Sequence, residues 1–182
     1  MISAIILAAG DSSRMGEENK LLLPINGEAL VRKVVRSVSL AEVENVLVVI
    51  GYEAKKIKKV LSDQHVDFVY NPIYSSGMTS SIKSGIEAVP GDRDGFMICL
   101  ADLPFVKTED FNVLIRAYSN FRVKGEKIVI VPVFKGQRGN PVLFSSEFRE
   151  KILDHKGEGC RGLIAKHSKN VMEIKMKNGN LV

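Results

Sequence analysis

The chain has 182 residues, of which 45% are hydrophobic and 26% are charged. This length and composition are typical of one folded domain with a single core, and they exclude a disordered or fibrous protein. The longest apolar run near the start, AIILAA, is far too short to cross a membrane or to form the apolar part of a signal peptide. Because Cys99 and Cys160 are the only cysteines, we expect no disulfide framework and a reduced, cytoplasmic protein without a membrane partner.

Positive charge is in slight excess, with 26 Lys and Arg against 21 Asp and Glu, for a formal net charge of +5. Part of this excess lies in the stretch EAKKIKKVL, where four lysines fall opposite the apolar residues at helical spacing. They are Lys55, Lys56, Lys58 and Lys59. No aromatic residues are interleaved with them for base stacking, so we interpret this surface as a solvated helix face and expect no nucleic-acid partner.

Predicted strands and helices alternate along the first two thirds of the chain. Strands are predicted at 1–7, 45–51, 66–70 and 95–102, and helices at 28–38, 53–61, 79–89 and 108–121. We expect Thr and Ser to cap the helix at 79–89 and Thr108 to cap the helix at 108–121. Mixed strands and short helices follow at 127–134, 140–144, 146–153, 160–167 and 170–176. This order predicts a three-layer α/β domain around a mostly parallel mixed sheet.

Two of the predicted strands run out into polar segments. One is the loop after Leu7, and the other is the segment ADLP after Leu100. Ligands of parallel α/β sheets collect outside the carboxyl ends of the strands, where the strand order reverses. We therefore expect both segments to face one crevice.

The first of these segments, LAAGDSSRMGEENK, combines features that suit phosphate oxygens. Gly10 allows a tight turn, two serines expose hydroxyls and backbone amides, and Arg14 and Lys20 supply cations. The spacing fits neither the dinucleotide fingerprint nor the P-loop, because five residues separate the two glycines. From these residues alone, a glycine-rich surface turn with incidental charges remains an equal alternative.

Five motifs in a fixed order carry a resemblance to a known family. They are LAAGDSSRMGEENK with LLLPINGEALV, then NPIYSSGMTSSIKSGI, CLADLPFV and GQRGNPVLF. Together they resemble the molybdopterin nucleotidyltransferases, most closely their cytidylyl branch, from about Ile2 to about Leu163. The resemblance implies a Rossmann-like nucleotidyltransferase fold and transfer of CMP from CTP to the terminal phosphate of a molybdenum-bearing or metal-free molybdopterin, with release of pyrophosphate. It also implies a molybdoenzyme or its maturation factor as a protein partner.

The resemblance assigns the nucleotide site to two segments. The first segment places backbone near the base and sugar and cations on the phosphates, and the second reads the base. The implied residues are Leu7, Ala8, Ala9, Gly10, Arg14 and Lys20 in the first segment, and Gly77, Met78, Ser80 and Ser81 in the second. Ala9 resembles the cytidylyl branch, whose guanylyl relatives tend to carry glycine there. Without the resemblance, the second segment is equally well explained as a capped helix and Lys20 as a solvent-exposed lysine.

Asp102 follows a buried strand and is the predicted ligand of Mg²⁺. Magnesium takes few protein oxygens and completes its octahedron with water and phosphate, so one unpaired carboxylate facing a triphosphate would suit it. The alternative is an aspartate that turns the chain before proline. In the family a second carboxylate comes from a later segment, which would begin where this chain ends at Val182. We therefore expect a single nucleotidyltransferase domain over 1–182 that either lacks that segment or binds metal through one carboxylate.

The resemblance places the acceptor site in the last third of the chain. The implied residues are Arg138, Gly139, Asn140 and Arg161, with a pterin phosphate as the acceptor. Many cytidylyl members have histidine where Asn140 stands. Cys160 has no histidine beside it in the sequence, and we interpret it as a small buried side chain rather than a nucleophile.

Other functions remain open. One is guanylyl transfer, or nucleotidyl transfer to a sugar or another small phosphate. A second is a nucleotide-binding protein without catalysis, which the missing second carboxylate favours. An NAD-dependent oxidoreductase is the least favoured, because the dinucleotide fingerprint is absent.

Overall fold

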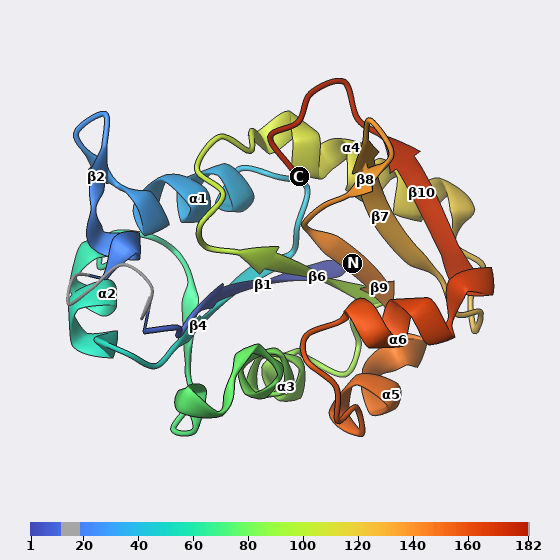
Figure 1. Ribbon diagram of the computed structural model, residues 1–182, viewed down its shortest axis with the longest axis horizontal. Helices are drawn as coiled ribbons and strands as arrows, with labels where there is room; N and C mark the ends of the chain where they lie inside the picture. Colours follow the sequence, from blue (N-terminus) through green and yellow to red (C-terminus); the bar gives the residue numbers. More distant parts are fainter. Residues whose placement is uncertain (12–18, 182) are drawn as a thin grey trace.

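The computed structural model describes residues 1–11 and 19–181 of the chain (Figure 1). An eight-stranded mixed sheet runs through its middle, and a two-stranded sheet stands beside it. The strands of the large sheet are β1 (Ile2–Ala8), β4 (Asn45–Ile50), β5 (Asp67–Tyr70), β6 (Gly95–Leu100), β7 (Val129–Phe134), β8 (Gln137–Arg138), β9 (Val142–Ser145) and β10 (Val171–Lys175). The small sheet consists of β2 (Pro24–Ile25) and β3 (Glu28–Ala29).

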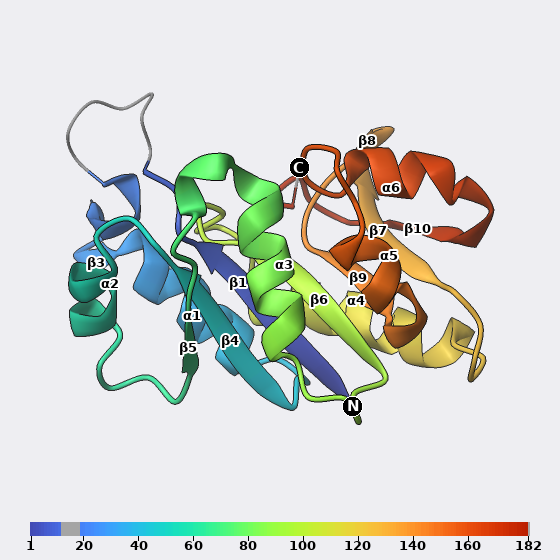
Figure 2. The same ribbon diagram turned by 90° about the horizontal axis from the view of Figure 1, so that it is seen from below.

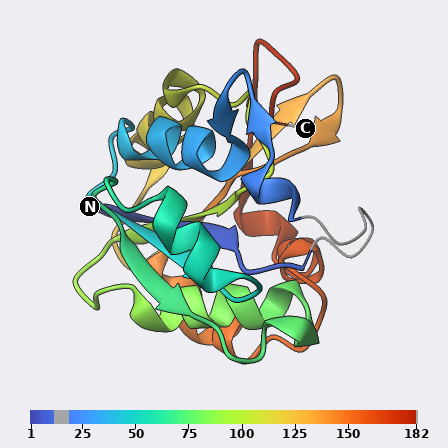
Figure 3. The ribbon, with the colours of Figure 1, turned by 90° about the vertical axis from the view of Figure 1, so that its left-hand side faces the viewer.

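Helices cover both faces of the large sheet, which confirms the three-layer α/β prediction. The α-helices are α1 (Leu30–Ser39), α2 (Ala54–Val60), α3 (Met78–Ala88), α4 (Thr108–Phe121), α5 (Arg149–Leu153) and α6 (Arg161–Lys166). Helices α1 and α4 lie on one face, and α3, α5 and α6 lie on the other (Figures 1 and 3). Helix α2 buries Ile57 in the same apolar cluster as α1 and α4. Its four lysines are exposed, as expected for a solvated helix face.

The strand order places the carboxyl ends of two neighbouring parallel strands together. The order is β10-β7-β9-β6-β1-β4-β5, so the chain moves from β1 to β4 and β5 on one side and then returns to β6 on the other. Strand β1 is parallel to both neighbours, and Leu7 is paired in register with Val49 of β4 and Leu100 of β6. The two polar segments therefore leave the sheet side by side, which confirms the predicted common crevice.

Most of the pairs formed by the last strands are antiparallel. Strand β9 is antiparallel to β6, and β7 is antiparallel to both β9 and β8. The chain leaves β9 at the opposite edge of the sheet, where Ser146 N–H donates to the carbonyl of Asp94 just before β6. It then returns along the face of the sheet through α5 and α6, beside α3 (Figure 2).

Both predicted helix caps are wrong. Helix α3 begins one residue earlier than Thr79, with Gly77 as its N-cap at a φ of 102°, and no side chain caps it. Thr108 lies inside the first turn of α4 and donates to the carbonyl of Ser37. The carboxylate of Asp110 instead accepts the backbone N–H of Lys107, because an acidic side chain three residues into a helix can reach back to that amide.

Among the residues that the structure describes, no helix is long and apolar enough to span a membrane.

Candidate functional site

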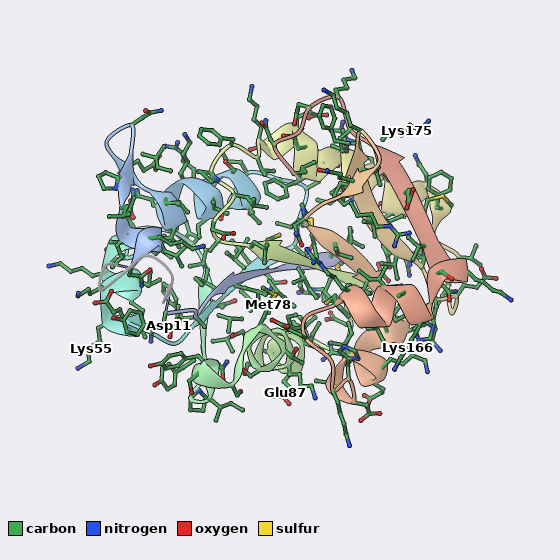
Figure 4. The ribbon with its side chains drawn as sticks, viewed as in Figure 1. Asp11, Lys55, Met78, Glu87, Lys166 and Lys175 are labelled. Atoms are coloured by element: carbon green, nitrogen blue, oxygen red, sulfur yellow. The ribbon has the colours of Figure 1, made fainter. Side chains whose placement is uncertain are left out.

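A cavity of about 380 Å³ opens at the carboxyl ends of β1 and β6. Five segments of the chain contribute side chains or backbone to its wall. The lining residues are Leu7, Ala9, Gly10, Asp11, Lys20, Leu21, Tyr74, Ser75, Gly77, Met78, Ser81, Leu100, Ala101, Asp102 and Glu158. Figure 4 labels two of them, Asp11 after β1 and Met78 at the start of α3. The cavity lies where the sequence predicted the crevice.

Lys20 reaches the cavity from a short 3₁₀ helix, η2 (Lys20–Leu22). Asn19 caps this helix, because its side-chain oxygen accepts the backbone N–H of Leu21 at 3.1 Å. Asn19 is 3% exposed, so the start of η2 is anchored in the protein. The Lys20 side chain emerges from this anchored turn and meets Asp102, its Nζ lying 2.7 Å from Oδ2.

The Lys20–Asp102 ion pair joins the two polar segments that follow β1 and β6. It differs from the sequence prediction in one respect, because the carboxylate of Asp102 was expected to be unpaired. The side chains of Lys20 and Asp102 are 37% and 36% exposed, so water screens their attraction. Such a pair contributes only about 0.2–1 kcal/mol to stability, and either partner can exchange it for a ligand at small cost.

The loop before α3 is held by a buried asparagine that the sequence reasoning missed. Asn71 is fully buried, donates to the hydroxyls of Ser80 and Ser81, and accepts the backbone N–H of Ile73. Ser80 in turn donates within this loop, to the carbonyl of Gly77 at 2.8 Å. The Ser80 hydroxyl therefore stabilises the loop, whereas Ser81 lines the cavity.

Tyr74 lines the cavity and was also not predicted from the sequence. Its side chain packs directly over Gly51, where a Cβ would lie 2.6 Å from the Tyr74 ring and Cβ. The ring of Tyr52 is tilted against it, with centroids 6.4 Å apart. Gly51 directly follows β4, and a glycine at that point permits such a close approach because it has no side chain.

The predicted acceptor residues do not line the cavity. Arg138 lies on β8, where its Nε donates to Glu173 of β10 at 2.8 Å. The backbone N–H groups of Gly139 and Asn140 donate to the carbonyls of Pro132 and Leu181. Arg161 is exposed at the first position of α6. Their roles at an acceptor remain predictions.

Of the described residues that were predicted to bind the nucleotide, Ala8 and Ser80 do not line the cavity. Ala8 is buried at the end of β1. Arg14 lies outside the described residues.

Neither cysteine is poised as a nucleophile. Burial raises the pKa of the Cys99 thiol well above its ordinary value, and it raises that of Cys160 to about 12. The thiol forms of both are therefore dominant at neutral pH, and the thiolate is the reactive form. Cys160 is partly buried against an apolar cluster, which fits its interpretation as a small apolar side chain.

The polar groups of the cavity fit a divalent cation that is shared with phosphate. Among residues 1–11 and 19–181, no group of three His, Cys, Asp or Glu side chains is arranged to hold a metal by itself. Asp102 instead offers one partly exposed carboxylate at the cavity wall. It lies beside the ammonium group of Lys20, which suits phosphate oxygens. Mg²⁺ and Mn²⁺ accept such a site, where one or two carboxylates, phosphate oxygens and water complete the octahedron.

The strand order, the switch point beside β1 and the cavity define an α/β domain with a candidate ligand site at the carboxyl ends of its parallel strands. The chain belongs to the family of MobA-like NTP transferase domains, which matches residues 4–171. The molybdenum cofactor cytidylyltransferase of Escherichia coli is 28% identical over 145 residues, which cover 79% of this chain and 70% of that protein. The bifunctional protein GlmU of Trichormus variabilis is 29% identical over 119 residues, which cover 65% of this chain. The chain matches only about a quarter (26%) of that GlmU's length.

Solved structures of the same fold cover nearly the whole chain. Rv0371c of Mycobacterium tuberculosis superimposes with a TM-score of 0.85 at 20% identity, covering 98% of this chain and 89% of that one. A manganese complex of Rv0371c superimposes with a TM-score of 0.81 at 17% identity, over 98% of this chain and 89% of that one. The 4-diphosphocytidyl-2C-methyl-D-erythritol synthase of Anaerococcus prevotii gives 0.78 at 18% identity, over 99% and 88%. These likenesses confirm the expected nucleotidyltransferase fold.

Proposed function

We propose that this protein is a nucleotidyltransferase that moves CMP from CTP to the terminal phosphate of a molybdopterin. The observation that carries the proposal is the meeting in one cavity of Lys20 and Asp102, which are 82 residues apart in the sequence. Membership of the NTP transferase family supports the reaction class. The 28% identity to a molybdenum cofactor cytidylyltransferase supports the nucleotide and the acceptor.

The reaction joins two phosphates and releases pyrophosphate. An oxygen of the acceptor's terminal phosphate attacks the α-phosphorus of CTP, and the bond between that phosphorus and the oxygen leading to the β-phosphate breaks. Negative charge then collects on the departing pyrophosphate. A fixed cation beside those oxygens stabilises the transition state more than the ground state, and this difference is what accelerates the step.

Lys20 supplies that cation in our proposal. It leaves the carboxylate of Asp102 and binds the phosphate oxygens, an exchange that costs little because the ion pair is more than a third exposed. Asp102 would hold Mg²⁺ through the carboxylate that Lys20 releases. The bound cation would neutralise charge on the triphosphate. Arg14, which the sequence assigns to the same phosphates, is proposed to act with Lys20.

The cytosine and ribose would lie against the remaining wall of the cavity. Ala9 and Gly10 continue from β1, and Gly77 begins α3 without a side chain that could obstruct a flat ring. Ser81 adds a hydroxyl on the same side. Ala9 favours CTP over GTP, because the guanylyl relatives that the sequence resembles tend to carry glycine at this position.

Nucleotide binding and pyrophosphate release with each nucleoside triphosphate test the proposal. The purified protein is mixed with Mg²⁺, one of the four triphosphates and molybdopterin. We expect the tightest binding with CTP, and pyrophosphate only when molybdopterin is present. Equal or tighter binding of GTP in competition would place the protein with the guanylyl transferases. Tight CTP binding without pyrophosphate release would instead indicate a nucleotide-binding protein without catalysis.

A further inference from the structure

We propose that Glu158 selects the acceptor of the transfer. Its carboxylate accepts hydrogen bonds from O–H or N–H groups of the acceptor, and Thr79 positions Glu158. The inference rests on the proposed nucleotidyl transfer and adds a residue that the sequence did not assign. Of the described residues that line the cavity, Glu158 alone comes from the chain beyond Asp102. It lies in the loop between α5 and α6, which also contains Cys160 and leads to Arg161.

Thr79 ties this loop to the first turn of α3 on both sides of Glu158. The Thr79 hydroxyl donates to the carbonyl of Gly157 at 2.7 Å and accepts the backbone N–H of Gly159 at 2.9 Å. A hydroxyl can donate once and accept at the same time, so one side chain satisfies the peptide groups that flank Glu158. The loop is thereby fixed to the helix that begins at the nucleotide site.

The two glycines beside Glu158 favour the same arrangement. Gly159 has a φ of +57°, a conformation that side chains disfavour, and a Cβ there would lie 3.5 Å from the sulfur of Met78. A Cβ on Gly157 would lie 2.6 Å from Nε2 of His155, whose ring folds back over the loop. The sequence Gly-Glu-Gly therefore brings the backbone close to α3 and His155, and Glu158 lines the cavity between them.

The chemistry of a carboxylate limits what Glu158 can recognise. Among residues 1–11 and 19–181, its carboxylate forms no hydrogen bond or ion pair with another side chain, and the residue is exposed. An ionised carboxylate only accepts hydrogen bonds, and it repels phosphate. Glu158 therefore suits the part of a phosphorylated acceptor that carries hydroxyl, ring N–H or amino groups. The cation Lys20 and the carboxylate Glu158 would then bind chemically different parts of the two substrates.

The test compares acceptor KM with nucleotide affinity in four variants. Glu158→Ala removes the carboxylate, Glu158→Gln keeps its shape without the charge, Thr79→Val removes both hydrogen bonds to the loop, and Thr79→Ser retains them. Glu87→Ala is the matched control, since Glu87 is an exposed glutamate on the outer side of α3 (Figure 4). Pyrophosphate release is measured against molybdopterin concentration, and CTP affinity is measured by titration in the presence of Mg²⁺ without acceptor.

We expect Glu158→Ala to raise the acceptor KM about ten- to a hundredfold, the range for a lost charge-assisted hydrogen bond, with kcat changed less than about threefold. Glu158→Gln should fall between Glu158→Ala and the wild type. Thr79→Val should raise the same KM by a smaller factor, and Thr79→Ser should restore it. CTP affinity and the melting temperature should change little in all of them.

Three results would overturn the inference, and they are distinguishable. An unchanged acceptor KM in Glu158→Ala, with an active wild-type protein, would refute the role of Glu158 and leave the proposed function standing. A weaker CTP affinity with an unchanged acceptor KM would make Glu158 a nucleotide contact instead. A wild-type protein that binds CTP but releases no pyrophosphate with molybdopterin would refute the proposed function and this inference together.

Discussion

The part of the chain from β1 through Asp102 and the part from β7 onward contribute very unequally to the cavity. The first part supplies every described lining residue except Glu158. Its neighbouring strands are parallel, so their carboxyl ends meet at one edge of the sheet, together with Lys20 and Asp102. In the second part, β9 is antiparallel to β6, and the chain has to return across the sheet before it reaches the cavity. Strand direction therefore decides which residues can act on a common ligand.

Asp102→Asn tests the first part and should have the largest effect. The substitution keeps the shape of the side chain and removes its charge, so the proposed metal site would lose its carboxylate. We expect metal-dependent pyrophosphate release to fall at least about a hundredfold, since a metal supplies several kcal/mol of charge stabilisation. The melting temperature without nucleotide should stay within about 2 °C, because the Lys20–Asp102 pair is partly exposed. A variant that keeps its activity would refute the metal role, and one that unfolds would favour an aspartate needed for the turn.

Lys20→Ala should have the next largest effect. Losing a charge-assisted contact worth about 1.5–3 kcal/mol lowers kcat/KM about ten- to a hundredfold. Arg14→Ala should lower it by a similar factor if it binds the same phosphates. Lys55→Ala is the control, because Lys55 is exposed on α2 and points away from the protein (Figure 4). Unchanged turnover in Lys20→Ala would contradict the proposal that the segment after β1 binds the phosphates.

Asn71→Ala tests the loop before α3. Asn71 is fully buried and holds Ser80, Ser81 and the backbone of Ile73, so its removal leaves buried polar groups unpaired at about 1–3 kcal/mol. We expect a lower melting temperature and about a three- to tenfold weaker CTP affinity, as the cavity wall from Tyr74 to Ser81 loosens. Thermal unfolding and CTP titration measure the two effects. A loss of stability with intact CTP affinity would show that this loop does not shape the nucleotide site.

The smallest effect is expected from His167, which belongs to the second part of the chain. Its ring packs edge-to-face on Phe148, and burial, with nearby Lys151, Lys127 and Lys166, lowers the pKa of the imidazole. Because the folded protein binds this proton less readily than the unfolded chain, stability is full above the ordinary histidine pKa near 6.5 and decreases as the pH falls below it.

The measurement is the melting temperature at pH 7.5 and pH 5.5. The decrease should be about 1–3 °C smaller in His167→Gln than in the wild type. His65→Gln, at an exposed histidine, should leave the decrease unchanged. If the melting temperature decreased equally in the wild type and both variants, His167 would not be the source of this pH dependence. CTP affinity at neutral pH should be the same in all three, because His167 does not line the cavity.

The sequence predicts the first part of the chain well. Buried strands such as 45–50 are long apolar runs. The polar residues after Leu7 and Leu100 indicate where β1 and β6 end. Parallel pairing of β1 and β6 then predicts that the segments with Lys20 and Asp102 lie close together. This prediction does not depend on side-chain contacts. The ion pair of Lys20 and Asp102 could not be predicted, because it depends on the turn that Asn19 anchors.

The second part of the chain was harder to predict. The placement of Glu158 depends on hydrogen bonds from Thr79, which lies 78 residues before Gly157 in the sequence. Arg138 was assigned to an anion on its motif, yet it pairs with Glu173 because β8 and β10 both lie alongside β7. Local patterns carry no information about such long-range neighbours. The same reason explains the two wrong helix caps, since Thr79 and Thr108 both bond to distant segments.

Backbone hydrogen–deuterium exchange with and without CTP and Mg²⁺ tests most directly whether the cavity between β1 and β6 binds the nucleotide. A second hollow, of about 580 Å³, lies at Gly125, Glu126, Lys127, Glu147 and Asn170, and provides the comparison within the same protein. We predict that the nucleotide slows exchange at 7–11, 20–22, 74–81 and 100–102 and leaves 125–127 and 170 unchanged. Slower exchange at 125–127 and 170, with none at the first four segments, would contradict the assignment of the nucleotide to the carboxyl ends of β1 and β6.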